Sequence, residues 1–187
     1  ANTRERRLQL PNDPYFAATA GSTGQWWLRP VGGSSANVLA DRLRGVPGLQ
    51  SAWALNGTGN GNTVVAVLDT GITAHPEFGA QVLPGYDFVS DLAIASDGDG
   101  RDADPSDPGD SVNQSDKDNN PVLFAGCDLQ SSSWHGTVIA GIVAAGTHNG
   151  IGVAGVNWAA RVLPVRVAGK CGAEVADIVD AMRWAAG

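Results

Sequence analysis

The chain has 187 residues, 43% of them hydrophobic, which is enough to build one folded domain with a core of its own. Its formal net charge is −7, from 12 Lys and Arg against 19 Asp and Glu, so we expect cations rather than nucleic acid as partners. No run of 18 or more apolar residues occurs, and we therefore expect no membrane-spanning helix and no membrane partner.

The N-terminal region, residues 1–30, mixes prolines with aromatic side chains and predicts an extended arm laid over a core. Its first residues lack the charged and then apolar pattern of a secretory signal, as expected for a processed protein. Short helical turns are predicted at residues 36–43 and 49–55, separated by Gly45, Pro47 and Gly48.

Three strands and two longer helices follow in alternation. Residues 63–68 predict a strand with five successive apolar positions, as in a strand buried on both faces of a parallel sheet, and residues 82–89 and 161–167 predict further strands. Residues 135–145 predict a helix that is apolar all round and therefore buried. Residues 173–186 predict an amphipathic helix. Its apolar positions are Val175, Ile178, Val179 and Met182. This order predicts an α/β fold with a parallel sheet.

A long acidic loop lies between the second strand and the first of these helices. Residues 90–129 are rich in Asp, Gly, Pro, Ser and Asn without periodicity, which is typical of a functional or ion-ordered segment. Repulsion among its closely spaced carboxylates would be relieved by a hard cation, and we expect calcium. These carboxylates are Asp97, Asp99, Asp102, Asp104 and Asp107. The alternative is a solvated acidic loop.

Cys127 and Cys171 are the two cysteines of the chain. In a secreted protein they predict a disulfide, and two reduced core thiols are the alternative. An oxidised pair would close a loop of about 45 residues, which corresponds to roughly 4 kcal/mol in the chain-entropy description.

Asp69 and His135 are the candidate catalytic residues. Asp69 follows a buried strand, and functional groups of parallel sheets collect beyond the carboxyl ends of the strands. A serine nucleophile needs an imidazole to take its proton, and that imidazole needs a carboxylate on its other nitrogen. Taken alone, Asp69 could equally be a turn residue and His135 a structural one.

The sequences around these two residues carry a family resemblance. Val65-Ala66-Val67-Leu68-Asp69-Thr70-Gly71-Ile72 and Trp134-His135-Gly136-Thr137 resemble the aspartate and histidine motifs of the subtilisin-like serine proteases, the subtilases. The resemblance extends over nearly the whole chain from Asn12, although Val138 stands where the family has a second histidine. The family's Gly-Thr-Ser-x-Ala motif, which carries the nucleophile, does not occur in these residues.

The resemblance implies that residues 1–187 form the N-terminal half of a subtilase catalytic domain, a three-layer sandwich around a parallel sheet. It also implies a calcium site near Asn12-Asp13-Pro14 and Thr147-His148-Asn149. The expected ligands there are Asp13, Glu77, Asn149, Ile151 and Val153. Asp87 resembles a ligand of a second calcium site.

The segment from Val167 to Gly172 corresponds to the part of a subtilase whose backbone pairs with an extended substrate peptide. Its residues are Val167, Ala168, Gly169, Lys170, Cys171 and Gly172.

These observations lead us to expect a secreted, calcium-stabilised serine endopeptidase that acts on peptides or proteins. Asp69 would orient His135, and the serine would come from a C-terminal remainder in the same polypeptide or in a second chain. The alternative function is a non-catalytic calcium-binding or interaction module. Zinc is disfavoured because the three histidines lack the spacing of known zinc motifs.

Overall fold

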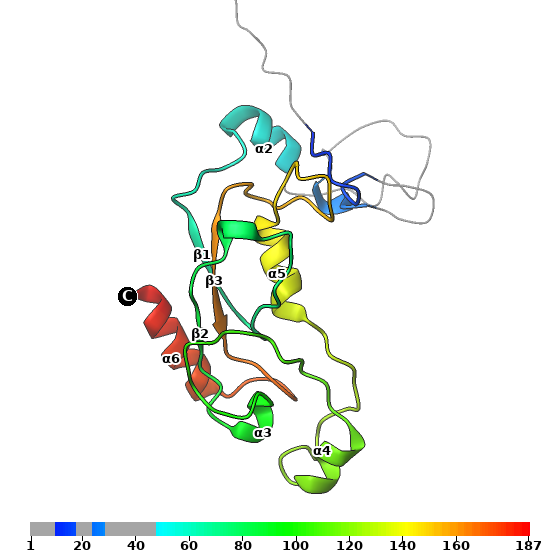
Figure 1. Ribbon diagram of the computed structural model, residues 1–187, viewed down its shortest axis with the longest axis vertical. Coiled ribbons are helices and arrows are strands. Elements are labelled where there is room, and N and C mark those ends of the chain that lie inside the picture. Colours follow the sequence, from blue (N-terminus) through cyan, green and yellow to red (C-terminus); the bar gives the residue numbers. More distant parts are fainter. Residues whose placement is uncertain (1–9, 18–23, 29–47) are drawn as a thin grey trace, which may run out of the picture. The chain divides into compact units, whose positions relative to one another are not determined.

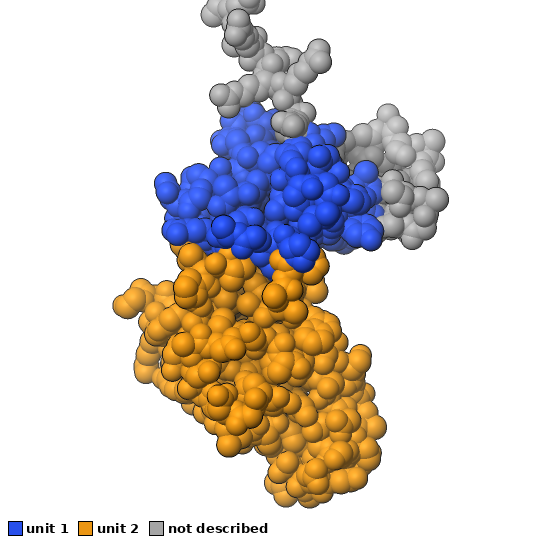
Figure 2. Space-filling view, in the orientation of Figure 1, with its two compact units in different colours: residues 1–63, 76–81, 141–161 blue, residues 64–75, 82–140, 162–187 orange. Residues whose placement is uncertain are grey.

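The computed structural model describes residues 10–17, 24–28 and 48–187. The chain divides into two compact units (Figure 2). Unit 1 comprises residues 1–63, 76–81 and 141–161, and unit 2 comprises residues 64–75, 82–140 and 162–187. The helical turn predicted at residues 36–43 lies outside the described residues.

Unit 2 is built on a three-stranded sheet in the order β1-β3-β2 (Figure 1). Its strands are β1 (Val64–Asp69), β2 (Tyr86–Asp87) and β3 (Arg161–Arg166). β2 runs parallel to β3, with Tyr86 opposite Val165. The predicted α/β fold with parallel strands is confirmed, and β1 lies at an edge of this sheet.

The second strand is shorter than the predicted range 82–89. Val82 forms an isolated bridge with Val162, and regular pairing resumes only at Tyr86. Pro84 has no N–H to donate to a ladder. At Gly85 a Cβ would lie 1.9 Å from the Pro164 carbonyl oxygen, so only glycine allows this close approach.

Helix α6 (Val175–Ala186) packs on one face of the sheet (Figure 1). Ala181 and Ile178 contact a cluster that includes Phe88, Val165 and Val167. Each Å² of apolar surface that this packing buries stabilises the fold by about 25 cal/mol. The sheet and α6 thereby form the main core of unit 2.

The expected apolar face of α6 was wrong in part, since of its four positions Ile178 packs on the sheet but Val175 and Met182 do not. Val175 and Met182 are 74% and 59% exposed, whereas Asp177 is 1% exposed. Asp177 is turned toward the sheet because its carboxylate accepts hydrogen bonds from Arg101 Nη2 at 2.5 Å and from the Ser90 N–H at 2.9 Å. Polar partners of Asp177 and the apolar contacts of Ile178 and Ala181 together define the buried side of the helix.

Helix α5 (His135–Ala144) is not buried on all sides, contrary to the prediction from its composition. Its small residues Gly136, Ala140 and Ala144 are buried, whereas Val138 and Ile142 are 55% and 37% exposed. Residues four positions apart share one face of a helix, so the buried face here is the row of small side chains.

The loop at residues 90–129 contains two short helices that the sequence pattern did not reveal. Asp91 caps α3 (Leu92–Ala95) by accepting from the N–H groups of Ala93 and Ile94. Asn113 and Asp116 form a capping box at α4 (Gln114–Asn119). These helices are too short to show a hydrophobic period, and their caps are their only sequence signal.

Unit 1 has a separate core. Its elements are η1 (Trp26–Leu28), α2 (Leu49–Asn56) and η2 (Gly79–Gln81). Phe16 and Leu28, from the predicted N-terminal arm, are buried with Trp53 and Ala154. The buried Gln25 side chain accepts from the Ala154 N–H and donates to the Ala154 carbonyl, both at 2.7 Å. The described part of the arm therefore belongs to the core.

Cys127 and Cys171 form the predicted disulfide in unit 2. Cys127 lies in a small cluster with Val112 and Phe124, and its partner directly precedes Gly172. The bond spans 44 positions and ties the loop at residues 90–129 to the segment that follows β3.

We predict that replacing both Cys127 and Cys171 by Ser lowers the free energy of unfolding by about 4 kcal/mol, because the unfolded chain regains the freedom of a long loop. Urea unfolding measures this change. Dithiothreitol should lower the midpoint of the native protein by a similar amount and leave the double variant unaffected. An unchanged midpoint of the native protein after reduction would contradict the prediction.

Candidate active site

Asp69 is the last residue of β1, and the chain around it is fixed by hydrogen bonds. Its carbonyl oxygen accepts from the N–H groups of Val167 at 2.9 Å and Ala168 at 3.2 Å. Its carboxylate accepts from the Thr70 N–H at 2.8 Å. The side chain is 14% exposed, so the carboxylate is held at the edge of the sheet with little contact to water.

His135 is the first residue of α5 and faces this carboxylate. Its Nδ1 lies 2.8 Å from both Oδ1 and Oδ2 of Asp69. Because an ionised carboxylate only accepts hydrogen bonds, it favours the tautomer with the proton on Nδ1. The His135 side chain is 59% exposed, and in that tautomer Nε2 is left as the acceptor. The pair therefore has the arrangement of a general base with its orienting acid.

A close backbone contact allows the two residues to meet. At Gly136 a Cβ would lie 2.2 Å from the Gly71 carbonyl oxygen and 3.2 Å from the Asp69 Cβ. Gly71 itself has φ 102°, a conformation that glycine adopts without strain. Any side chain at Gly136 would separate the beginning of α5 from the end of β1.

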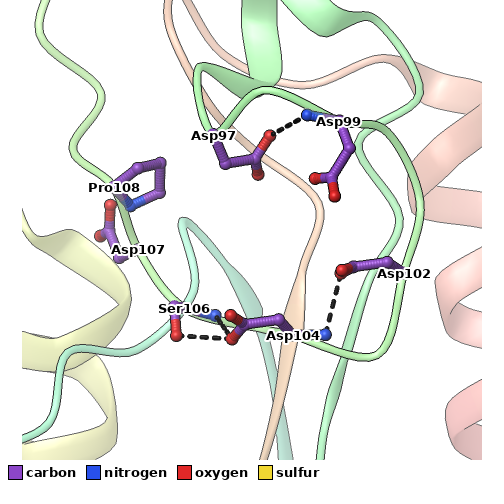
Figure 3. A pocket seen from close by; sticks show the side chains of 7 residues that line it. All are labelled: Asp97, Asp99, Asp102, Asp104, Ser106, Asp107 and Pro108. Carbon is purple, nitrogen blue, oxygen red and sulfur yellow. Dashed lines mark hydrogen bonds between the residues drawn. The ribbon is translucent and has the colours of Figure 1, made fainter.

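The acidic loop surrounds a cavity of about 200 Å³ (Figure 3). Neighbouring groups of the loop itself satisfy several of its carboxylates. Asp102 Oδ1 accepts from the Asp104 N–H at 2.8 Å, and Asp104 Oδ1 accepts from the Ser106 hydroxyl at 2.5 Å and N–H at 3.0 Å. These hydrogen bonds from Ser106 lower the pKa of Asp104. The cavity is lined by Asp97, Asp99, Asp102, Asp104, Ser106, Asp107 and Pro108.

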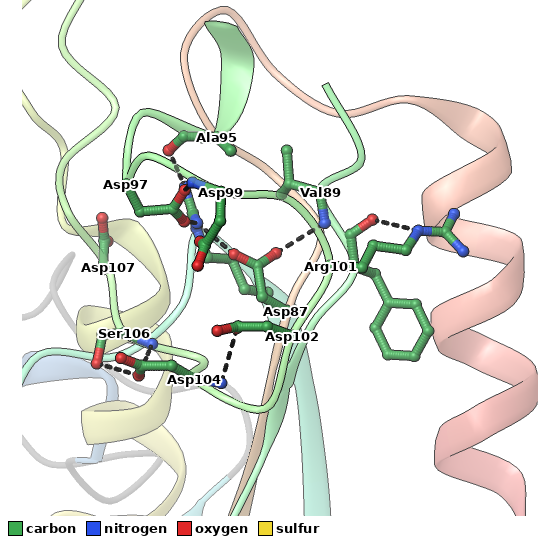
Figure 4. A network of polar contacts seen from close by, with 12 residues as sticks. Asp87, Val89, Ala95, Asp97, Asp99, Arg101, Asp102, Asp104, Ser106 and Asp107 are labelled. Carbon is green, nitrogen blue, oxygen red and sulfur yellow. Dashed lines mark hydrogen bonds and ion pairs between the residues drawn. The ribbon is translucent and has the colours of Figure 1, made fainter. Parts of the chain in front are cut away.

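A buried arginine, Arg166, pairs with the carboxylates of Asp87 and Asp97, whose positions Figure 4 shows. The Arg166 guanidinium forms ion pairs with Asp87 and Asp97 and donates to the Ala95 carbonyl. Asp87 is fully buried, and its Oδ1 accepts from the Val89 N–H at 2.7 Å. Burial raises the pKa of Asp87 to about 6, against the opposing effects of the Val89 N–H and Arg166.

Sequence reasoning missed Arg166. The only signal in the sequence was a charged residue in the apolar run of β3. Its position opposite Asp87 is seen only in the structure. Arg166 places a positive charge beside both Asp87 and Asp97, two of the expected calcium ligands. A second cation in contact with either carboxylate would face repulsion from the guanidinium.

The other group of expected calcium ligands lies in unit 1. Glu77 is buried, and its carboxylate accepts from the Asn149 side chain at 3.0 Å and from the Val153 N–H at 2.7 Å. Asp13 Oδ2 accepts from the His148 N–H at 3.1 Å. Asp13 Oδ1 is buried and finds no hydrogen-bond partner among the described residues. Ile151 donates its N–H to Asn149 Oδ1 at 2.9 Å.

The expected substrate segment forms a tight turn after β3. Gly169 and Gly172 exchange backbone hydrogen bonds, and the Lys170 N–H donates to the Ile94 carbonyl at 3.0 Å. Since the N–H groups of Val167 and Ala168 reach Asp69, the chain itself uses most donors of the segment. Cys171 and Gly172 are its exposed residues.

Comparison with known proteins identifies the family. The subtilase family matches residues 60–187. The chain belongs to the subtilases. It is 50% identical over 141 residues to the "Extracellular protease" of Xanthomonas campestris pv. campestris, across 74% of this chain and 23% of that protein. It is 42% identical over 177 residues to the "Extracellular basic protease" of Dichelobacter nodosus, across 95% of this chain and 26% of that protein.

A solved structure has the same fold. A protease from Pseudoalteromonas arctica matches this subtilase chain with a TM-score of 0.70 and 42% identity, across 95% of this chain and 44% of that one. The chain thus spans about a quarter of the length of the two relatives named above, and less than half of the solved chain.

Two further findings apply to residues 10–17, 24–28 and 48–187. No helix there is both long enough and apolar enough to cross a membrane. In the same ranges, no three or more His, Cys, Asp or Glu side chains converge in a way that could hold a metal ion. Asp13 and Glu77 are only two acidic residues, so a site there would need amide and carbonyl ligands as well.

The Asp87 pKa predicts a pH-dependent contribution to stability. Because burial raises this pKa from 3.8 to about 6, the folded protein binds the proton more tightly than the unfolded chain. The contribution is fully present below about pH 4 and is lost as the pH rises to about 6. The free energy of unfolding of Asp87→Asn should therefore rise relative to the native protein across this window. Urea unfolding at several pH values measures the difference.

The control is Asp118→Asn, an exposed side chain that accepts from Gln114 in α4. Parallel curves for the native protein and Asp87→Asn between pH 4 and 6 would contradict the assignment.

Proposed function

We propose that this chain supplies the acid and the base of a serine endopeptidase whose nucleophilic serine lies outside residues 1–187. The proposal rests on one observation, the approach of His135 Nδ1 to both carboxylate oxygens of Asp69 at 2.8 Å. A turn aspartate or a structural histidine does not require this geometry. Triad chemistry requires it, because the carboxylate must fix the tautomer of the base.

In the proposed reaction, His135 Nε2 takes the proton of the serine hydroxyl while the serine oxygen bonds to the carbonyl carbon of the scissile peptide. Asp69 stabilises the imidazolium that forms. Nε2 then gives the proton to the leaving amine as the C–N bond breaks, and water repeats the sequence to release the acyl product.

We further propose that the substrate is a peptide or protein segment in an extended conformation. It would pair with the backbone of the segment from Val167 to Gly172, whose exposed residues are Cys171 and Gly172.

Exposed apolar side chains support the proposal that a further part of the catalytic domain covers unit 2, from the same polypeptide or from a second chain. Val64 on the edge strand β1 is 43% exposed, and Val175 and Met182 on α6 are 74% and 59% exposed. An uncovered strand edge with such a surface promotes aggregation.

Secretion is supported by the disulfide and by the names of the extracellular relatives.

We propose calcium as a structural ion in unit 1, held by Asp13, Glu77, Asn149, Ile151 and Val153. The supporting observation is Asp13 Oδ1, a buried anionic oxygen without a hydrogen-bond partner among the described residues. Leaving such an oxygen unpaired is costly, and a hard cation is a suitable partner. In the acidic loop of unit 2, calcium stays a prediction, since Arg166 already provides a positive charge there.

The first test uses the complete protein. An organophosphorus serine reagent should abolish peptide hydrolysis, and Asp69→Asn should lower kcat by about 10⁴-fold, the loss found for the same change in another serine protease. Retained activity after complete labelling would exclude the serine mechanism. A folded complete protein without any peptidase activity would favour a non-catalytic calcium-binding or interaction module.

The second test concerns calcium. Saturation at about 100 times the Kd should raise the free energy of unfolding by about 2.7 kcal/mol. Asp13→Asn should lose most of this gain, whereas Asp104→Asn, in the acidic loop, should keep it. Thermal melting with calcium and with a chelator measures both variants. Loss of the calcium effect in Asp104→Asn alone would move the ion to unit 2.

A further inference from the structure

The beginning of α5 is held by two hydroxyl groups, and a buried aspartate orients each of them. The first N–H groups of a helix have no partner within the helix, and here the first two belong to His135 and Gly136. How these groups are satisfied therefore bears directly on the position of the proposed catalytic base.

The first hydroxyl belongs to Thr70, the neighbour of Asp69. Thr70 Oγ1 donates to Asp107 Oδ2 at 2.7 Å and accepts from the Gly136 N–H at 3.0 Å. Thr70 and Asp107 are 7% and 8% exposed. The second of these hydrogen bonds joins the residue after the acid to the residue after the base, and the first joins Asp107 to them.

The second hydroxyl belongs to Ser133. Its Oγ donates to Asp110 Oδ2 at 2.7 Å and accepts from the His135 N–H at 3.3 Å. Asp110 is 8% exposed and also accepts from the Ser133 N–H at 2.6 Å. The arrangement repeats that of Thr70, with the weaker contact at the helix.

The direction of these hydrogen bonds follows from the chemistry of the carboxylates. An ionised carboxylate has no proton to give, so each hydroxyl must point its single proton toward the aspartate. The lone pairs of the hydroxyl oxygen are then available to the N–H groups of α5. Without the carboxylates, both hydroxyls could rotate and present a proton to the helix instead.

Each carboxylate oxygen of Asp107 and Asp110 accepts a hydrogen bond. Asp107 Oδ1 accepts from the Gly109 N–H at 2.8 Å while its Oδ2 accepts from Thr70. The Asp107 N–H also donates to the Ile72 carbonyl at 3.1 Å, which fixes the loop to the turn after Asp69. Asp107 was also an expected calcium ligand, and these hydrogen bonds show where its carboxylate lies.

We propose that Asp107 and Asp110 are positioning residues of the active site. Each orients a hydroxyl group that caps α5, and together they hold His135 against Asp69. The inference rests on the proposed peptidase function, because it assigns these residues to the geometry of the same acid and base. Since the Gly136 contact is shorter than the His135 contact, Asp107 has the larger effect.

The test is made in the complete protein with Asp107→Asn and Asp110→Asn. An amide has one acceptor oxygen where the carboxylate has two, so either a backbone N–H or the hydroxyl loses its acceptor. Asp107→Asn should lower kcat by about 10-fold to 100-fold, as expected for a small displacement of a catalytic group, with KM almost unchanged. Asp110→Asn should show a smaller loss in the same direction.

Thr70 provides a matched pair of variants. Thr70→Val keeps the shape and removes the hydroxyl, and should reproduce the loss of kcat. Thr70→Ser keeps the hydroxyl and should recover most of it. Asp118→Asn, in α4, has no contact with these groups and serves as the charge-matched control with unchanged kcat.

The low-field proton resonance of His135 Nδ1–H provides a readout independent of turnover, because it reports the hydrogen bond to Asp69. It should shift or broaden in Asp107→Asn and Thr70→Val and stay in place in Thr70→Ser. If kcat and the resonance are both unchanged in Asp107→Asn, or if only the melting temperature falls, the proposal is overturned. A native protein without peptidase activity would refute the proposed function, while the resonance would still test the positioning.

Discussion

The contact between the end of β1 and the beginning of α5 is the constraint on which the rest of the site depends. The Gly71 carbonyl lies so close to Gly136 that no side chain fits between them. Only this approach brings the Asp69 carboxylate within 2.8 Å of His135 Nδ1. The imidazole is more than half exposed, so packing around the ring cannot fix it, and backbone contacts and hydrogen bonds must do so instead. The His135 side chain can then remain open to solvent while the ring keeps one orientation.

The acidic loop contributes to this arrangement in two ways. The first part of the loop is joined to the sheet through Arg166. This buried guanidinium forms ion pairs with Asp87 of β2 and with Asp97 of the loop. Removing one partner of such a buried pair is strongly destabilising, because it leaves an uncompensated charge in the interior. The middle of the loop carries Asp107 and Asp110, which accept hydrogen bonds from Thr70 and Ser133 beside β1 and α5. A segment whose sequence predicts an ion-binding loop thus also links β1 to α5 through hydrogen bonds.

Much of the fold was predictable because the apolar strands and the longer helices follow simple periods. β1 and β3 appear within one residue of their predicted bounds, and the motif around Asp69 and His135 led to the correct family. The errors have physical causes. The face of α6 was misjudged because Arg101 and Ser90 hold Asp177 inward. The burial of α5 was overestimated because composition alone cannot distinguish Gly136 and Ala140, which pack, from Val138, which does not.

The sequence by itself determined the family, the α/β fold, the pairing of two cysteines and the identity of the candidate acid and base, since each of these depends on local patterns or on short motifs. Only the tertiary structure decided how the aspartates are used. Asp87, Asp97 and Asp107 look alike in the sequence, yet the first two pair with Arg166 and the third orients Thr70. The partners lie between 37 and 79 positions away along the chain. A carboxylate takes its role from the charge or donor that folding brings beside it, and no local pattern encodes that neighbour.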